Sequence, residues 1–210
     1  MSNSDESNSL KETAEQKFLA AEYQALITLD GARNERLDRL LTTFVTLAAA
    51  PWALYALTLK DHSPIPSFSE MPPFVAAAFG LIGVLGALVA MMYIQVWFSV
   101  VLYMRAVNAI RGYFLEANTL LSFHLPVRSD RPPYYDKGNY IQLAVGGMAL
   151  VNSGYAGVAL FILFPCEICV RVLAVCALVL ACWLGQMYYF YHQADKRDRR
   201  SKSGSLQWKK

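Results

Sequence analysis

The chain has 210 residues, of which 55% are hydrophobic, with a formal net charge of +3 and a mean hydropathy of +0.29. Soluble domains are usually about 45–50% apolar, so this composition argues against an ordinary soluble domain. The apolar residues gather in charge-free runs, which indicates membrane spans. The sequence therefore predicts an all-α, polytopic integral membrane protein.

The N-terminal segment is polar and is expected to stay outside the membrane. Residues 1–9 are rich in Ser, Asn, Asp and Glu, and we expect them to be disordered. The run Ser9-Leu10-Lys11-Glu12 has the form of a capping box and predicts a cytosolic amphipathic helix over residues 10–38. Gly31 is expected to break or bend that helix. The first forty residues contain no apolar core of a secretory signal, so we expect the N-terminus to face the cytosol.

Four apolar runs predict four transmembrane helices, packed as an antiparallel bundle over residues 39–192. The spans are expected at about residues 40–59, 74–104, 140–164 and 169–192. The second contains no charged residue from Phe74 to Met104, which exceeds the roughly 20 residues that cross a bilayer. It is expected to continue as a helix into the cytosolic segment 105–139.

The distribution of Lys and Arg predicts the orientation. Five lie in the N-terminal segment, five in residues 105–139 and seven in the basic tail of residues 193–210. The two remaining loops hold only Lys60 and Arg171. The positive-inside rule therefore places both termini and the middle segment in the cytosol, with the chain in an inner or plasma membrane. Ser201, Ser203 and Gly204 predict a flexible tail.

Small residues recur in three spans at a spacing that lets helix backbones approach closely in lipid. They are Gly80, Gly83 and Gly86 in the second span, Ala149, Ser153 and Gly157 in the third, and Ala177, Ala181 and Gly185 in the fourth. One interpretation is packing among the four helices of one chain. The other is self-association into a homo-oligomer, and the two are compatible.

The deepest polar residues of the spans are Gln95, Asn152, Ser153, Tyr155 and Gln186. Asn152 and Ser153 are expected either to hydrogen-bond another helix or to line a narrow polar path. The near absence of charge inside the spans argues against an ion-coupled transporter. A pore between protomers is compatible with apolar lining.

Cationic side chains gather just inside the expected membrane boundary. Arg105, Asn108 and Arg111 lie along one side of the continuing helix, and Arg128 and Arg131 follow in the same segment. They predict either contact with anionic lipid head groups or a recognition face for an acidic partner, a nucleotide signal or nucleic acid. The sequence has no Walker lysine loop and no Gly-x-Gly-x-x-Gly motif, so no nucleotide-binding motif is present. Among the possible partners, we expect a cytosolic sensor protein rather than nucleic acid.

Cys166 and Cys169 form a Cys-x-x-Cys pair at the outer end of the fourth span, close to Arg171. A helix N-terminus favours the reactive thiolate, so the pair is a candidate redox dithiol; a structural disulfide or two free thiols are the alternatives. A metal site would need further ligands. The motif resembles that of the vitamin K epoxide reductase and DsbB types of membrane thiol oxidoreductase, which implies a quinone cofactor. Those families use a second cysteine pair in an outer loop, and residues 60–73 contain no cysteine.

The layout from Lys11 to Asn118 resembles that of small bacterial membrane effectors of the SMODS/SLOG-associated, SLATT-like type. These have a cytosolic helix, a tight transmembrane hairpin and a long helix that continues inward; the second hairpin of this chain departs from that layout. The predicted function is a non-enzymatic membrane effector or interaction protein. We expect it to be oligomeric, with or without a pore, to use no cofactor and to act with a cytosolic partner. The alternative is a quinone-linked thiol oxidoreductase that uses Cys166 and Cys169.

Overall fold

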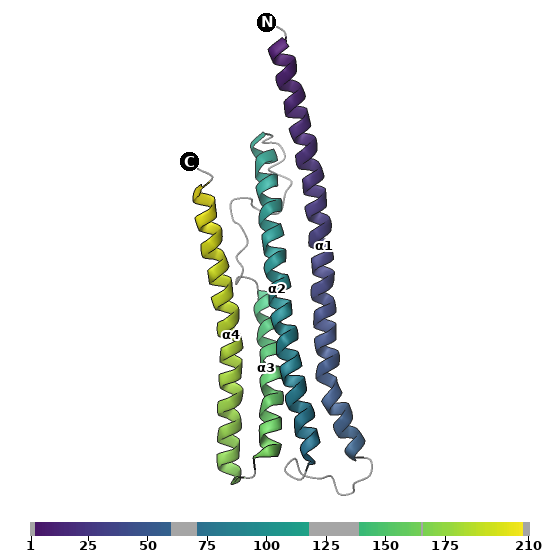
Figure 1. Cartoon of the computed structure of the whole chain (residues 1–210), viewed down its shortest axis with the longest axis vertical. Helices are drawn as coiled ribbons and strands as arrows, with labels where there is room; N and C mark the ends of the chain where they lie inside the picture. Colours follow the sequence, from purple (N-terminus) through teal and green to yellow (C-terminus); the bar gives the residue numbers. More distant parts are fainter. Residues whose placement is uncertain (1–2, 60–70, 118–138, 165, 208–210) are drawn as a thin grey trace. The chain divides into compact units, whose positions relative to one another are not determined.

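The computed structural model describes residues 3–59, 71–117, 139–164 and 166–207, and these ranges are almost entirely helical (Figure 1). The helices are α1 (Asn3–Leu59), α2 (Pro73–Ala117), α3 (Asn139–Leu163) and α4 (Ile168–Gln207). The described ranges contain no strand. The predicted all-α class is confirmed for this part of the chain.

Each helix contains a stretch that is long and apolar enough to cross a membrane. These stretches are Gln16–Leu57, Pro73–Ile110, Tyr140–Leu163 and Ile168–Arg199. Each includes or closely matches one of the four predicted spans, because the same charge-free runs that favour lipid also contain enough helix-forming residues to avoid interruption. The prediction of four helices of spanning length and polarity is confirmed.

Helix α1 differs from its prediction at two places. It begins at Asn3, so the segment expected to be disordered is helical where the structure describes it, and it continues through Gly31 without a break. A glycine inside a helix costs only roughly 1 kcal/mol relative to alanine, which long helical segments on both sides offset. Apart from the local helix backbone, no described atom lies within 4 Å of the position that a Cβ at Gly31 would take, so no close packing bends the helix there.

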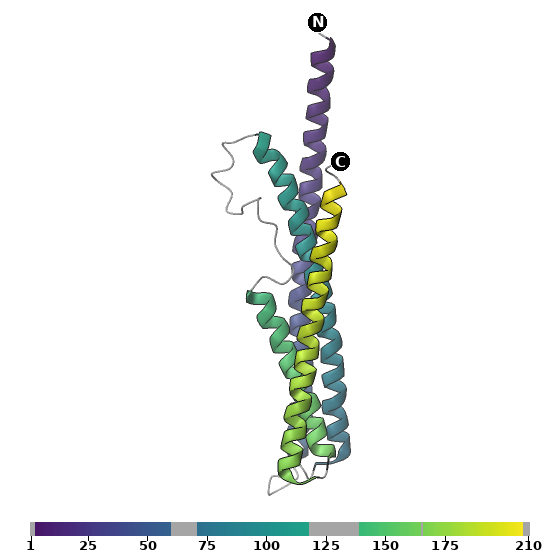
Figure 2. The ribbon, with the colours of Figure 1, turned by 90° about the vertical axis from the view of Figure 1, so that its left-hand side faces the viewer.

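Helices α2 and α4 both run past their predicted spans as unbroken ribbons (Figure 2). For α2 this confirms the helical continuation into segment 105–139, as far as Ala117. For α4 it makes the prediction of a flexible tail wrong, because the helix continues through Gly204 to Gln207. Lys, Arg and Gln are good helix formers, and Asp195 forms an ion pair of 2.7 Å with Arg199 one turn later.

The chain divides into two compact units. One combines Met1–Arg36 with Phe98–Pro133, and the other combines Leu37–Trp97 with Tyr134–Lys210. The division falls inside α1 and inside α2, so the apolar run predicted as one span to Met104 is shared between the units. In the first unit, Phe98, Val100 and Val101 are fully buried although they lie in that run.

The second unit contains the sites considered below. Its α3 and α4 pack against each other, and one core cluster joins Val75 and Phe79 of α2 to Tyr155 and Ala159 of α3. The Tyr155 hydroxyl donates a hydrogen bond to the Ala48 carbonyl oxygen of α1. This bond satisfies a phenol that would otherwise be buried without a partner.

Candidate functional site: a cavity among α2, α3 and α4

The glycines of α2 allow its backbone to approach α3. A Cβ at Gly83 would lie 3.2 Å from the backbone oxygen of Asn152, and one at Gly80 would lie 3.7 Å from the Cβ of Ala159. A Cβ at Gly86 would overlap the side-chain oxygen of Asn152. The three glycines predicted from their spacing therefore all face α3, with the tightest approach at Gly86.

The small residues of α3 also lie in contacts within the chain. A Cβ at Gly157 would stand 2.6 Å from Cγ2 of Val179 and 3.1 Å from Cγ1 of Val175, so α3 and α4 are in close contact there. Ala149 and Ser153 are 1% exposed each. This stripe is used for packing inside the chain, as the first of the two interpretations predicted.

The small residues of α4 behave differently. Ala177, Ala181 and Gly185 are exposed, and no atom outside the local backbone lies within 4 Å of a Cβ built at Gly185. The sequence spacing is the same as in α3, but Ala177 and Ala181 are left uncovered within the described part of the chain, and Gly185 borders the cavity described below. The two uncovered alanines remain available to lipid or to a second copy.

A buried polar cluster connects α3 to α4. The Asn152 side-chain amide donates to Oε1 of Gln186 at 3.2 Å, and the Gln186 amide donates to the Ser153 hydroxyl at 3.4 Å and to the Cys182 carbonyl at 3.4 Å. Ser153 donates to the Ala149 carbonyl at 2.7 Å. The expected hydrogen bonding of Asn152 and Ser153 to another helix is confirmed. Such bonds fix the rotation of one helix against another in an apolar interior.

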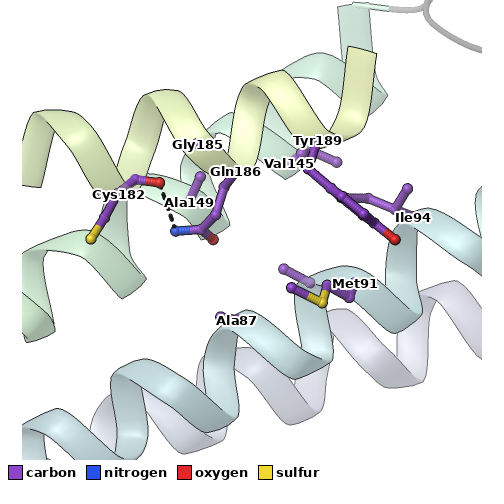
Figure 3. Close-up of a pocket in the computed structure, with 10 residues that line it drawn as sticks. Ala87, Met91, Ile94, Val145, Ala149, Cys182, Gly185, Gln186 and Tyr189 are labelled. Carbon is purple, nitrogen blue, oxygen red and sulfur yellow. Dashed lines mark hydrogen bonds between the residues drawn. The ribbon is translucent and has the colours of Figure 1, made fainter. Parts of the chain in front are cut away.

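A cavity of about 280 Å³ lies beside this cluster. Figure 3 shows α4 on one side of the cavity, carrying Cys182, Gly185, Gln186 and Tyr189, and Ala87 and Met91 of α2 on the opposite side. Ala90 and Ile94 of α2 and Val145 and Ala149 of α3 complete the lining. The wall is largely apolar, and the Gln186 amide and the Tyr189 hydroxyl are its polar groups. It can hold an apolar chain or ring with few polar contacts.

A second polar cluster joins α2 to α4 next to the cavity. The Gln95 amide donates to the Tyr189 hydroxyl at 3.4 Å, and the Arg197 guanidinium donates to Oε1 of Gln95 at 2.8 Å. Sequence reasoning identified Gln95 as a deep polar residue and Arg197 as part of the tail, but did not connect them. The sequence signal that could have indicated this contact is an isolated glutamine in a charge-free run, because such a polar side chain needs a hydrogen-bond partner on another helix.

The two cysteines of the Cys-x-x-Cys motif are both free thiols, Cys166 half-buried and Cys169 exposed. The cavity begins on α4 at Cys182, thirteen residues beyond Cys169, which is roughly 20 Å along a helix. A quinone bound in this cavity would therefore not touch the pair. Redox activity stays a prediction from the motif. The described residues also contain no group of three His, Cys, Asp or Glu side chains that could hold a metal ion.

Arg171, which lies close to the Cys-x-x-Cys pair in the sequence, contacts the turn between α3 and α4. Its Nη2 donates to the Cys166 carbonyl oxygen at 3.0 Å, and its guanidinium lies 5.1 Å from the centre of the Phe161 ring. The Cys166 amide donates to the Phe164 carbonyl at 3.0 Å. The side chain therefore satisfies backbone and aromatic groups of the turn, which is a structural role.

The predicted cationic face is only partly within the described structure. Arg105 and Asn108 are half-buried on α2, and Arg105 has an interaction partner. The backbone at Arg111 is helical. Arg128 and Arg131 lie outside the described residues.

In comparisons with known proteins, no protein-family model, no curated protein and no solved structure matches the chain.

Proposed function

We propose that the chain is a four-span protein of an inner or plasma membrane, with antiparallel helices and both termini in the cytosol. Four helices of sufficient length and apolarity support insertion. The Lys and Arg distribution supports the orientation. Residues 73–97 of α2 would extend about 37 Å as a helix, enough for the roughly 30 Å hydrocarbon core, so the span ends near Trp97 in this proposal.

The topology can be tested by labelling single cysteines. In a variant with all four native cysteines changed to Ser, a cysteine introduced at Ser63 or Ser67 is expected to react with a membrane-impermeant maleimide on intact cells. A cysteine at Ser201 is the matched control and is expected to react only after lysis. Reaction at position 63 or 67 only after lysis would contradict the proposed orientation.

Within this topology, the geometry best supports a non-enzymatic membrane effector or interaction protein that acts with an acidic cytosolic partner such as a sensor protein. The observation that carries the proposal is the continuity of α2 from Pro73 to Ala117. One continuous helix links Arg105 and Asn108 to Gly80, Gly83 and Gly86, where it contacts α3. A partner that binds the extension can therefore move the spanning part of the same helix.

We further propose that the protein self-associates through α4. None of the residues in the most apolar 18-residue stretch of α4 is buried in the chain, compared with 44% for α3. Ala177 and Ala181 are exposed on this helix and allow close backbone approach. A pore, if formed, would lie between protomers.

Changing Ala177 and Ala181 together to Leu is expected to reduce the protein mass of the detergent-extracted assembly, because Leu side chains keep two α4 backbones apart. The measurement is size-exclusion chromatography with light scattering in a mild detergent. Ala49 and Ala53 of α1 are also exposed and four residues apart, so the Ala49→Leu, Ala53→Leu variant is a matched control and should retain the wild-type mass. A monomeric wild type would refute the oligomer.

The same preparations distinguish a pore from a scaffold. Reconstituted in liposomes, an oligomeric pore would let ions reach an entrapped indicator dye and change its fluorescence. The Ala177→Leu, Ala181→Leu variant would not. Oligomers that show no ion flux would contradict the pore and would remain consistent with an interaction protein.

A further inference from the structure

The cavity among α2, α3 and α4 exists because small residues line it on all three helices. Ala87 and Ala90 of α2, Ala149 of α3 and Gly185 of α4 lie in its wall, and a Cβ built at Gly185 would meet no described atom outside the local backbone within 4 Å. The resulting volume of about 280 Å³ is just below the roughly 300–1,000 Å³ range of drug-sized ligand sites. Water would find few hydrogen-bond partners in this space, so an apolar occupant is favoured.

The polar groups of the wall leave one hydrogen-bond donor for an occupant. The amide nitrogen of Gln186 donates to two oxygens of the protein, and its Oε1 accepts from Asn152, so this side chain is already satisfied. Tyr189 differs, because its hydroxyl accepts from the Gln95 amide at 3.4 Å and no described residue accepts its proton. Figure 3 shows the Tyr189 side chain reaching from α4 towards Ile94 on the α2 side of the cavity.

The direction of the hydrogen bond to Tyr189 is fixed by Arg197. Its guanidinium donates to Oε1 of Gln95 at 2.8 Å, so the Gln95 amide nitrogen is the atom turned towards Tyr189. An amide nitrogen can only donate, and the Tyr189 hydroxyl must therefore accept and keep its own proton for another group. Arg197 has a further interaction within the chain, and we assign it no contact with an occupant. The complement of this cavity is an apolar, uncharged group that carries a hydrogen-bond acceptor at one end.

The depth of the cavity fits the start of a lipid chain. Its walls extend from Ala87 to Ile94 on α2 and from Cys182 to Tyr189 on α4, each a separation of seven residues or roughly 10 Å of helix. In the proposed topology both helices run towards the cytosol and the α2 span ends near Trp97. Ile94 and Tyr189 then lie near the cytosolic boundary of the hydrocarbon core, where the ester carbonyls of lipids are found, and the cavity continues towards the midplane as an acyl chain does.

We propose that this cavity binds one acyl chain of a glycerolipid from the cytosolic leaflet, whose ester carbonyl accepts a hydrogen bond from the Tyr189 hydroxyl. The proposal rests on the proposed insertion and orientation of the protein. Recognition depends on the alkyl chain and its ester, and the charge of the head group plays no part. The bound chain contacts α2, α3 and α4 together, so its presence stabilises the arrangement in which these helices enclose it.

The test uses the full-length protein in vesicles that contain a phosphatidylcholine with a photoactivatable diazirine on one chain. In one set that chain is joined to glycerol by an ester, and in the other by an ether, which lacks the carbonyl. After illumination, peptides that contain Met91 and residues 182–189 are expected to carry roughly two- to ten-fold more label from the ester lipid, the effect of one neutral hydrogen bond. Peptides of α1 with the exposed Val45 and Leu57 give the background and should be labelled equally by both lipids. Label confined to other peptides, or equal labelling of the cavity peptides by the two lipids, would overturn the proposal.

Two variants, each with a matched control, test the donor and the space separately. Tyr189→Phe is expected to lower labelling by the ester lipid to the level of the ether lipid, with ether labelling unchanged. Tyr188→Phe removes a neighbouring hydroxyl from a side chain that is 71% exposed and outside the lining, and it should keep the wild-type ratio. Gly185→Leu places a side chain into the open space at the wall and is expected to abolish label from both lipids. Ala53→Leu makes a similar addition at an exposed position of α1 and should label as wild type. Wild-type labelling of Tyr189→Phe or of Gly185→Leu would overturn the proposal.

Failure of the proposed insertion is separable from failure of this site. A chain that leaves the vesicles on alkaline carbonate washing is not inserted, and the membrane proposal then fails. A chain that is retained but carries no label at the cavity peptides keeps the membrane proposal and removes the lipid site. Because the comparison of the two lipids on the wild type requires no substitution, a variant that fails to fold does not block the test.

Discussion

Replacing Gly86 with Ala is expected to destabilise the packing of α2 on α3 by roughly 1–3 kcal/mol, the usual cost of overpacking. The added Cβ would overlap the side-chain oxygen of Asn152 and would stand 3.3 Å from a ring carbon of Phe44. Asn152 is 3% exposed and donates to Gln186, so it cannot move aside without losing that hydrogen bond. Unfolding in detergent, followed by circular dichroism against temperature or added dodecyl sulfate, measures the change.

Two controls separate this overlap from the general effect of changing a helical glycine. At Gly154 of α3, no described atom outside the local backbone lies within 4 Å of the position that a Cβ would take, and Gly154→Ala should be neutral or slightly stabilising. Combining Gly86→Ala with Asn152→Ala should cost less than the sum of the two single changes, because the second removes the overlapping atom. A Gly86→Ala protein as stable as wild type would show that the α2 backbone does not approach Asn152 this closely.

Replacing Gly157 with Leu is expected to be the more damaging of two changes that look equivalent in sequence. At Gly157 the first added carbon already lies 2.6 Å from Val179, and the rest of a Leu side chain would force α3 and α4 apart. At Gly185 the same residue enters open space. We expect Gly157→Leu to lower the unfolding midpoint strongly or to prevent folding, and Gly185→Leu to remain near the wild type.

The comparison is made on both proteins extracted in one detergent, with helical content and unfolding midpoint measured in parallel. Gly157→Ala provides an intermediate step, since its single Cβ meets the flexible ends of Val175 and Val179 rather than backbone. Equal stability of the two Leu variants would contradict the placement of Gly157 against α4. A Gly185→Leu protein less stable than Gly157→Leu would show that the closely packed face lies at Gly185 and not at Gly157.

The four helices could be predicted because a long apolar run without charges fits a hydrocarbon core and also contains good helix-forming residues. The N-terminal end of α1 and the C-terminal end of α4 could not be predicted from the sequence. Their residues are polar, such as Lys196 and Asp195 of α4, and polar residues are compatible with either a solvated helix or a coil. The predicted break or bend at Gly31 and the predicted flexible tail at Gly204 rest on the intrinsic preference of glycine alone. A glycine inside a helix costs about 1 kcal/mol relative to alanine, and the helical segments on both sides offset this cost. Whether they do so depends on the neighbouring residues and not on the glycine itself.

The candidate site shows a different limit. Ala149, Ser153 and Gly157 have the same spacing as Ala177, Ala181 and Gly185, yet the first set is buried and the second is exposed. Spacing predicts that residues share a face but not which way the face turns. That rotation is set by distant partners, here Asn152 with Gln186. The link from Tyr189 through Gln95 to Arg197 joins residues about a hundred positions apart, which local patterns do not register.

In the membrane topology proposed above, the contacts of Arg171 bear on how the α3–α4 hairpin would enter the membrane during synthesis. The turn at Phe164–Ile168 is the part that would have to traverse the hydrocarbon, and Arg171 is its cation. Because the guanidinium is already bonded to the Cys166 carbonyl and stacked on Phe161, part of its hydration is replaced before transfer. A preformed hairpin would therefore cross at lower cost than an open chain with a hydrated arginine, and α3 and α4 would be inserted as a single unit.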